Sequence, residues 1–204
     1  MKKTIFRYLV WLPLVLAAGP VHAHAPIPGI KGFYVGLLHP FSTPSQAVLM
    51  LGLGLLVGGF AVAKVRWFLG AFLVFSVLGV VFGSANLGLD AALFSAAVAA
   101  CSLAALAPGR LMPLGVVLTA VGAVLIGFVS IPDAGLQRDR VITMSGSLVG
   151  ANIGLLYLWG FTYFVKQRLL WPWVGIGFRI AAAWVAAIAL LMLALGLAAV
   201  DTAS

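Results

Sequence analysis

Six long runs of apolar residues, separated by short polar connections, dominate the chain after residue 44. Each run is close to the ~20 residues that an α-helix needs to cross the hydrocarbon core of a bilayer. The pattern therefore predicts an all-α integral membrane protein, a bundle of about six transmembrane helices. The expected spans are residues 45–63, 67–85, 89–107, 113–131, 142–165 and 174–200.

The start of the chain follows a different pattern. A short basic stretch is followed by an apolar stretch, residues 8–20, that is too short to span comfortably, and Val21-His22-Ala23 then places small residues at a cleavage site. These features predict a signal peptide, residues 1–23. The alternative is an uncleaved anchor helix that adds a seventh span. A Lys-Lys signal without a lipobox cysteine is typical of a protein of the bacterial inner membrane.

Residues 24–44 are expected to form an external N-terminal segment before the transmembrane domain, residues 45–200. The segment begins with a proline- and glycine-rich stretch, which indicates extended backbone. A short apolar piece follows, and Pro40 within it removes a backbone donor and disfavours helix at His39. We therefore expect a break in the chain at His39.

Composition narrows the class of protein. The chain is 64% hydrophobic and 8% charged, whereas about a quarter of the residues of a soluble domain are charged. So few charges cannot build a water-facing surface, so the lipid bilayer is the expected environment. The net charge of +8 does not indicate a nucleic-acid partner, because the basic residues flank the apolar runs and form no cluster with aromatic residues.

The positions of the charges predict the orientation. If the mature chain starts outside and every span crosses, both mature termini lie on the periplasmic side. The basic residues expected inside are Lys64, Arg66, Arg110, Lys166, Arg168 and Arg179. Those expected outside are Lys31, Arg138 and Arg140, together with the acids Asp90, Asp133, Asp139 and Asp201. This excess of basic residues inside obeys the positive-inside rule.

Glycines at helical spacing indicate close helix packing. Gly146, Gly150 and Gly154 lie four residues apart on the fifth expected span. Small residues at this spacing let helix backbones approach, the main source of contact between helices in lipid. The spacing is compatible with packing inside one bundle and also with a homo-oligomer.

Candidate chemistry is confined to a few polar groups. The chain has no nucleotide-binding, serine-hydrolase or zinc-protease motif and no carboxylate pair, so we expect neither an enzyme nor a bound cofactor. His39 lies at the external mouth of the first span, and imidazole is a common ligand of Ni, Co, Cu and Zn. His24, the expected new N-terminus, is a second candidate metal ligand. The alternative is that His39 has only a structural role, because a lone histidine at the membrane interface commonly forms a structural hydrogen bond. The uncharged groups that could line a polar path are Ser45, Gln46, Asn86 and Asn152.

An early histidine, Gly32-Phe33, Gly36, His39-Pro40 and Met50 follow one another in register after the signal peptide. This series and the six-span plan resemble the HupE/UreJ family, small membrane proteins associated with hydrogenase and urease gene clusters. The family is regarded as nickel or cobalt permeases, so the resemblance implies a transported divalent metal ion.

The chain departs from the HupE/UreJ motif at its centre. Where the family motif HPxxGxDHxxxM has glycine, aspartate and histidine, this chain has Thr43, Ser45 and Gln46. The aspartate and histidine are the presumed metal ligands of the family. Only His24 and His39 therefore carry over as candidate ligands.

Two functions remain open. The first is a divergent permease that moves a transition-metal ion or another small solute past His39. The second is a non-transporting scaffold or accessory protein for a membrane or metalloenzyme-assembly partner. In a permease, Gln46, Asn86 and Asn152 should converge on one polar cavity beside His39. In a scaffold, they should pair separately between helices.

Overall fold

A computed structural model of the chain describes residues 32–84, 88–132 and 136–201. These residues contain seven α-helices and no β-strand, which confirms the all-α prediction. The predicted signal peptide, His24 and Asn86 lie outside the described residues. The helices are α2 (Phe33–Ser42), α3 (Pro44–Gly58), α4 (Val62–Phe82), α5 (Asp90–Leu106), α6 (Met112–Val129), α7 (Gln137–Arg168) and α8 (Val174–Asp201).

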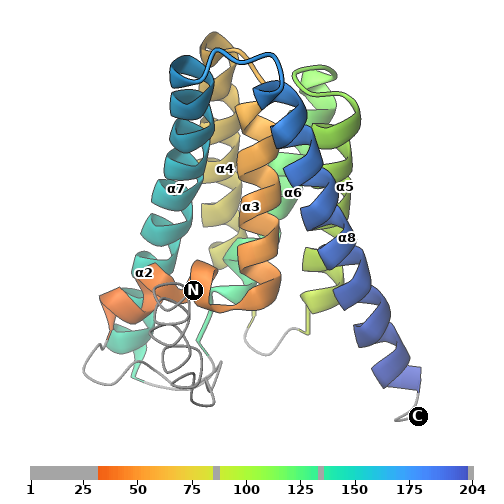
Figure 1. Cartoon of the computed structure of the whole chain (residues 1–204). Coiled ribbons are helices and arrows are strands. Elements are labelled where there is room, and N and C mark those ends of the chain that lie inside the picture. The colour runs from red at the N-terminus through yellow and green to blue at the C-terminus, as the bar shows by residue number, and fades with distance from the viewer. Residues whose placement is uncertain (1–31, 85–87, 133–135, 202–204) are drawn as a thin grey trace, which may run out of the picture.

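The helices α3 to α8 form an elongated bundle, and the short α2 lies at one end of it (Figure 1). Among the described helices, four are long and apolar enough to cross a membrane: α4, α6, α7 and α8. The pair α2 and α3, bent by 74°, counts as a fifth span if the two helices cross together. Helix α5 is apolar but has 17 residues, which is about 25 Å of helix. By helix length and hydropathy the chain is a multi-pass membrane protein, and four or five of the six predicted spans meet these criteria.

The predicted break at His39 is wrong, because helix α2 continues through His39 and Pro40 to Ser42. The bend lies at Thr43, whose backbone is extended with φ −95° and ψ 118°. Thr43 precedes Pro44, the first residue of α3, and the residue before a proline is biased away from helical geometry. The second proline, and not Pro40, therefore separates the two helices.

Helix α3 lies at the centre of the bundle and contacts α2, α5, α6, α7 and α8. Its apolar side chains Leu49, Met50, Leu53 and Val57 are fully buried and form much of the core. Hydrophobic side chains on α4, α7 and α8 remain exposed along their lengths, as expected for surfaces that face lipid. The core therefore surrounds a helix that begins at the bend.

Close backbone contact joins α2 to α7. A Cβ atom added at Gly36 would meet the backbone oxygen of Thr143, and one added at Gly150 would meet the backbone oxygen of Leu37. Gly146 faces the carbonyl of Phe33 in the same way. The predicted role of Gly146 and Gly150 in packing is confirmed inside one chain, and their contacts hold the first two turns of α2 against α7.

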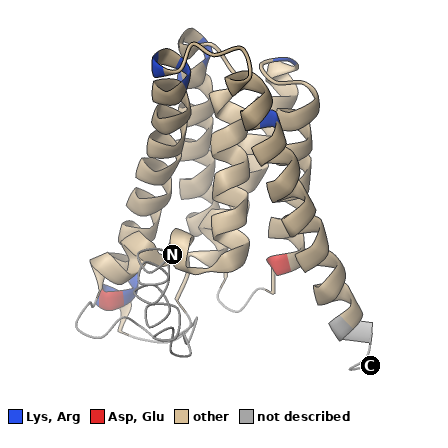
Figure 2. Cartoon of the chain, in the orientation of Figure 1, with Lys and Arg blue, Asp and Glu red and all other residues tan. Residues whose placement is uncertain are grey.

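The described charges separate to the two ends of the bundle, as the sequence predicts (Figure 2). We call one end of the bundle the basic end. There α3, α5 and α7 end and α4, α6 and α8 begin, and these helix ends and their connections carry Lys64, Arg66, Arg110, Lys166, Arg168 and Arg179. The opposite end holds α2 together with Asp90, Arg138, Asp139 and Arg140. Helix α7 begins at Gln137, five residues before the expected span of residues 142–165.

Candidate functional site

The bend at Thr43 brings His39 of α2 beside Gln46 of α3. The Nε2 atoms of the two side chains lie 3.2 Å apart. The same His39 Nε2 lies 3.3 Å from the carbonyl oxygen of Val129, the last residue of α6. Gln46 is buried to 1% exposure, whereas His39 is half-buried. The two residues form a polar contact at the end opposite the basic end.

The hydrogen bonds of this pair leave one polar atom without a partner. As the amide is oriented, Gln46 Nε2 faces His39, and Gln46 Oε1 is buried with no hydrogen-bond partner among the described residues. If His39 Nε2 carries its proton, it donates to Val129 O, and the amide must turn so that Oε1 faces the ring. Gln46 Nε2 then occupies the position that has no hydrogen-bond partner among the described residues. Leaving a buried polar group unpaired costs about 1–3 kcal/mol, so this position favours a ligand or a water molecule.

Asp90 contributes a carboxylate next to the same turn of α3. The hydroxyl of Ser45 donates to Asp90 Oδ1 at 2.6 Å, which joins the start of α3 to the start of α5. Ser45 is adjacent in sequence to Gln46. The sequence places Asp90 at the end of a span, where a helix-end role explains it, so its contact with the predicted site residue Ser45 was not predicted. The signal that could have indicated this contact is that Ser45 and Asp90 lie at span ends expected on the same side of the membrane.

A chamber of about 300 Å³ lies beside His39. Its polar lining includes His39 from α2, Ser130 after α6, and Thr143 and Ser147 from α7. The hydroxyls of Ser130 and Ser147 lie 2.7 Å apart, and Ser130 donates to the carbonyl of Ile126 at 2.6 Å, so Ser147 is the donor between the two. Sequence reasoning missed these hydroxyls, because serine and threonine in apolar helices commonly bond only to their own helix.

Asn152 takes no part in this cluster. Its amide nitrogen donates to Ser76 Oγ of α4 at 3.2 Å and to the carbonyl of Leu148 at 2.9 Å. The structure thus brings Gln46 to His39 and joins Ser45 to Asp90, but it pairs Asn152 separately between α4 and α7. In the described part of the chain, no group of three His, Cys, Asp or Glu residues is placed to hold a metal ion.

Comparison with family models, curated proteins and solved structures finds no match to this chain. The resemblance to the HupE/UreJ family therefore rests on the motif residues and the six-span plan of the sequence alone. The site has to be interpreted from its own geometry.

Proposed function

We propose that the chain is a permease-like membrane protein that takes up a small solute at the end that holds His39. A divalent transition-metal ion of the nickel or cobalt class is the first candidate for this solute. The observation that carries the proposal is the buried amide of Gln46, which has one unpartnered atom and lies beside an imidazole at a helix bend. The rest of the surrounding bundle offers few other polar groups.

The donor set suits a weakly held ion. The imidazole of His39 is a ligand for Ni, Co, Cu and Zn, and the amide oxygen of Gln46 is a harder ligand that gives a mixed N and O set. Two such ligands hold a divalent ion less tightly than a closed four-ligand site. Weak binding is an advantage in transport, because an ion that binds too tightly is not released.

The bent pair α2 and α3 also supports transport. In many transporters, substrate sites form where helices are discontinuous, because irregular backbone at membrane depth is tolerated where it lines a cavity. Here the bend at Thr43 lies between His39 and Gln46, and His39 lines the chamber. This chamber, next to the bend, gives a solute access to His39 and to the hydroxyls of Ser130 and Ser147.

The distribution of charge supports an orientation for this uptake. We assign the His39 end to the periplasm and the basic end to the cytoplasm of a bacterial inner membrane, in agreement with the positive-inside rule. The solute would then enter from the periplasm. The mature N- and C-termini would both lie on the periplasmic side.

Uptake by proteoliposomes tests the proposal. The purified protein is reconstituted, and entry of Ni²⁺, Co²⁺, Cu²⁺ and Zn²⁺ is measured for the unmodified protein, His39→Ala and Asn152→Leu. Asn152→Leu is the control, since it removes a polar side chain that pairs with Ser76, away from His39. We expect uptake of at least one ion, lost in His39→Ala and kept in Asn152→Leu. Uptake that His39→Ala leaves unchanged for all four ions would contradict the proposal.

A second candidate is a non-transporting scaffold for a membrane or metalloenzyme-assembly partner, or for a second copy of the chain. The observation that favours it is the separate pairing of Asn152 with Ser76 and of Ser130 with Ser147, which holds helices together without a shared path. A scaffold predicts no ion uptake by the reconstituted protein. It also predicts co-purification of a specific partner that survives His39→Ala.

A further inference from the structure

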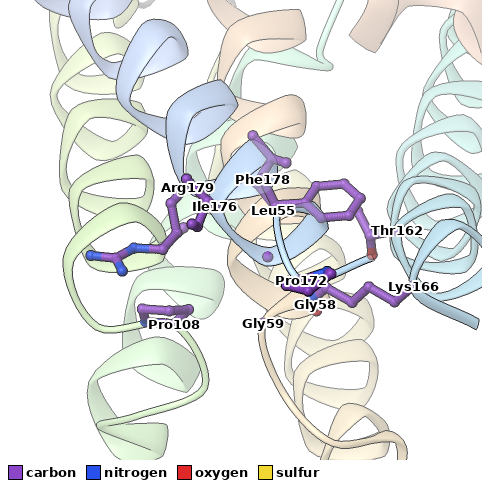
Figure 3. Close-up of a pocket in the computed structure, with 12 residues that line it drawn as sticks. Leu55, Gly58, Gly59, Pro108, Thr162, Lys166, Pro172, Ile176, Phe178 and Arg179 are labelled. Carbon is purple, nitrogen blue, oxygen red and sulfur yellow. Dashed lines mark hydrogen bonds between the residues drawn. The ribbon is translucent and has the colours of Figure 1, made fainter. Parts of the chain in front are cut away.

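A second cavity lies at the basic end, far from the chamber beside His39. It has a volume of about 370 Å³ and is bordered by α3, α5, α7 and α8. Lys166 and Thr162 approach it from α7, and Arg179 lies on the other side of it, on α8 (Figure 3). Among the described residues that line it, none is acidic. The cavity therefore combines two cations with an apolar wall.

Backbone carbonyls, and not carboxylates, hold the two cations in place. Lys166 Nζ donates to the carbonyl of Gly58 at 2.6 Å, and Arg179 Nε donates to the carbonyl of Ala105 at 2.7 Å. Gly58 ends α3 and Ala105 lies in the last turn of α5, so each cation caps a helix C-terminus. The guanidinium of Arg179 therefore lies against the end of α5, on the side of the cavity away from Lys166 (Figure 3).

The charges around the cavity do not cancel. A helix terminus carries about half an elementary charge, positive at the N-terminus and negative at the C-terminus. The cavity borders the C-terminal ends of α3, α5 and α7 and the N-terminal end of α8. With the whole charges of Lys166 and Arg179 included, about one positive charge is left. One negative charge, the charge of a phosphodiester, would balance it.

Neighbouring aromatic residues indicate the depth of the cavity in the membrane. Trp171 and Trp173 lie between α7 and α8, with ring centroids 5.3 Å apart, and each is 56% exposed. Tryptophan is enriched at the level of the lipid headgroups. Pro172, between these two tryptophans, lines the cavity. The cavity is thus at the height of the lipid phosphates.

We propose that this cavity binds a phosphate group, and that its source is the phosphodiester of an anionic phospholipid in the leaflet at the basic end. Lys166 Nζ donates to the phosphate oxygens, and Arg179 contributes its positive charge from the other side of the cavity. The first turn of α8, where Gly175 and Ile176 line the cavity, adds backbone N–H groups that have no partner within their own helix. The acyl chains extend along the exposed apolar faces of the bundle. This site is independent of the proposed uptake at His39, and either can fail alone.

Native mass spectrometry of the detergent-purified full chain tests the proposal. Phosphatidylglycerol and phosphatidylcholine, which differ in net charge, are added in turn to the unmodified protein, to Lys166→Gln/Arg179→Gln and to Arg66→Gln. Glutamine keeps a donor for the Gly58 and Ala105 carbonyls, so the folded state should survive the double change. Arg66, which lies over the ring of Trp67 and does not line the cavity, is the matched control for lost charge at the same end.

We expect the unmodified protein and Arg66→Gln to retain phosphatidylglycerol over phosphatidylcholine, and the double variant to lose this preference by about tenfold. Equal retention of both lipids by all three proteins would overturn the lipid assignment. A separate arm adds inorganic phosphate and measures the melting temperature. A rise that the double variant lacks, without lipid preference, would assign the phosphate site to a soluble ligand. No effect in either arm would overturn the site. Lys166→Arg, which keeps the charge, should retain the preference if the double variant fails to fold.

Discussion

Replacing Gln46 with leucine should separate function from stability at the candidate site. Gln46→Leu removes a fully buried amide, one atom of which has no hydrogen-bond partner among the described residues. An unpaired buried polar group costs about 1–3 kcal/mol, whereas the single bond to His39 contributes about 1 kcal/mol. His39 loses little, because its Nε2 still has the carbonyl of Val129 at 3.3 Å. Leucine also fills most of the same volume with apolar atoms.

We therefore expect Gln46→Leu to leave the protein as stable as before or to stabilise it by up to about 2 kcal/mol. Equilibrium unfolding of the purified protein in mixed micelles measures this difference. The control is Asn152→Leu, whose amide nitrogen has two acceptors at 2.9 and 3.2 Å. That variant should lose about 1–2 kcal/mol. If Gln46→Leu destabilises the protein as much as Asn152→Leu does, the amide has a structural partner and the reasoning about its unpaired atom is refuted.

Three further predictions concern packing, orientation and processing. Gly150→Ala should destabilise the protein by about 1–3 kcal/mol in the same unfolding assay, because its Cβ would meet the carbonyl of Leu37. In the control Gly160→Ala, nothing described lies within 4 Å of the added Cβ, so stability should stay the same or rise. An equal loss of stability in both variants would contradict the packing of α2 on α7. Alkaline phosphatase fused after the last residue should be active, and fused between α7 and α8 inactive; the reverse pattern would invert the proposed orientation. Intact mass of the purified protein should lack residues 1–23, and a full-length mass would replace the signal peptide with an anchor helix.

The helical bundle and the separation of its charges were predictable from the sequence, because both follow from runs of residues. Apolar runs long enough to cross a bilayer have few alternatives to a helix. The end of the bundle at which each loop charge lies depends only on the order of these runs along the chain. The number of spans was harder to predict. Helix α5, with 17 residues, and the bent pair α2 and α3 lie near the limit of what crosses a membrane.

The details of the candidate site depend on contacts between distant residues and were predictable only in part. Pro40 alone indicates a helix break, but α2 continues through it and the extended residue before Pro44 makes the bend. The contact of Asp90 with Ser45 joins residues 45 positions apart. No local pattern encodes such a pairing. His39 and Gln46 were identified because polar side chains in or beside an apolar span are functional candidates.

Equilibrium binding of ions to the purified protein tests the central claim most directly. Ni²⁺, Co²⁺, Cu²⁺ and Zn²⁺ are titrated by calorimetry into the unmodified protein, His39→Ala, Gln46→Leu and Asn152→Leu. The proposed site predicts that at least one ion binds the unmodified protein and Asn152→Leu alike, and that binding weakens tenfold or more in His39→Ala and Gln46→Leu. Binding that is equal in all four proteins, or absent from the unmodified protein for every ion, would contradict a metal site at the bend between α2 and α3.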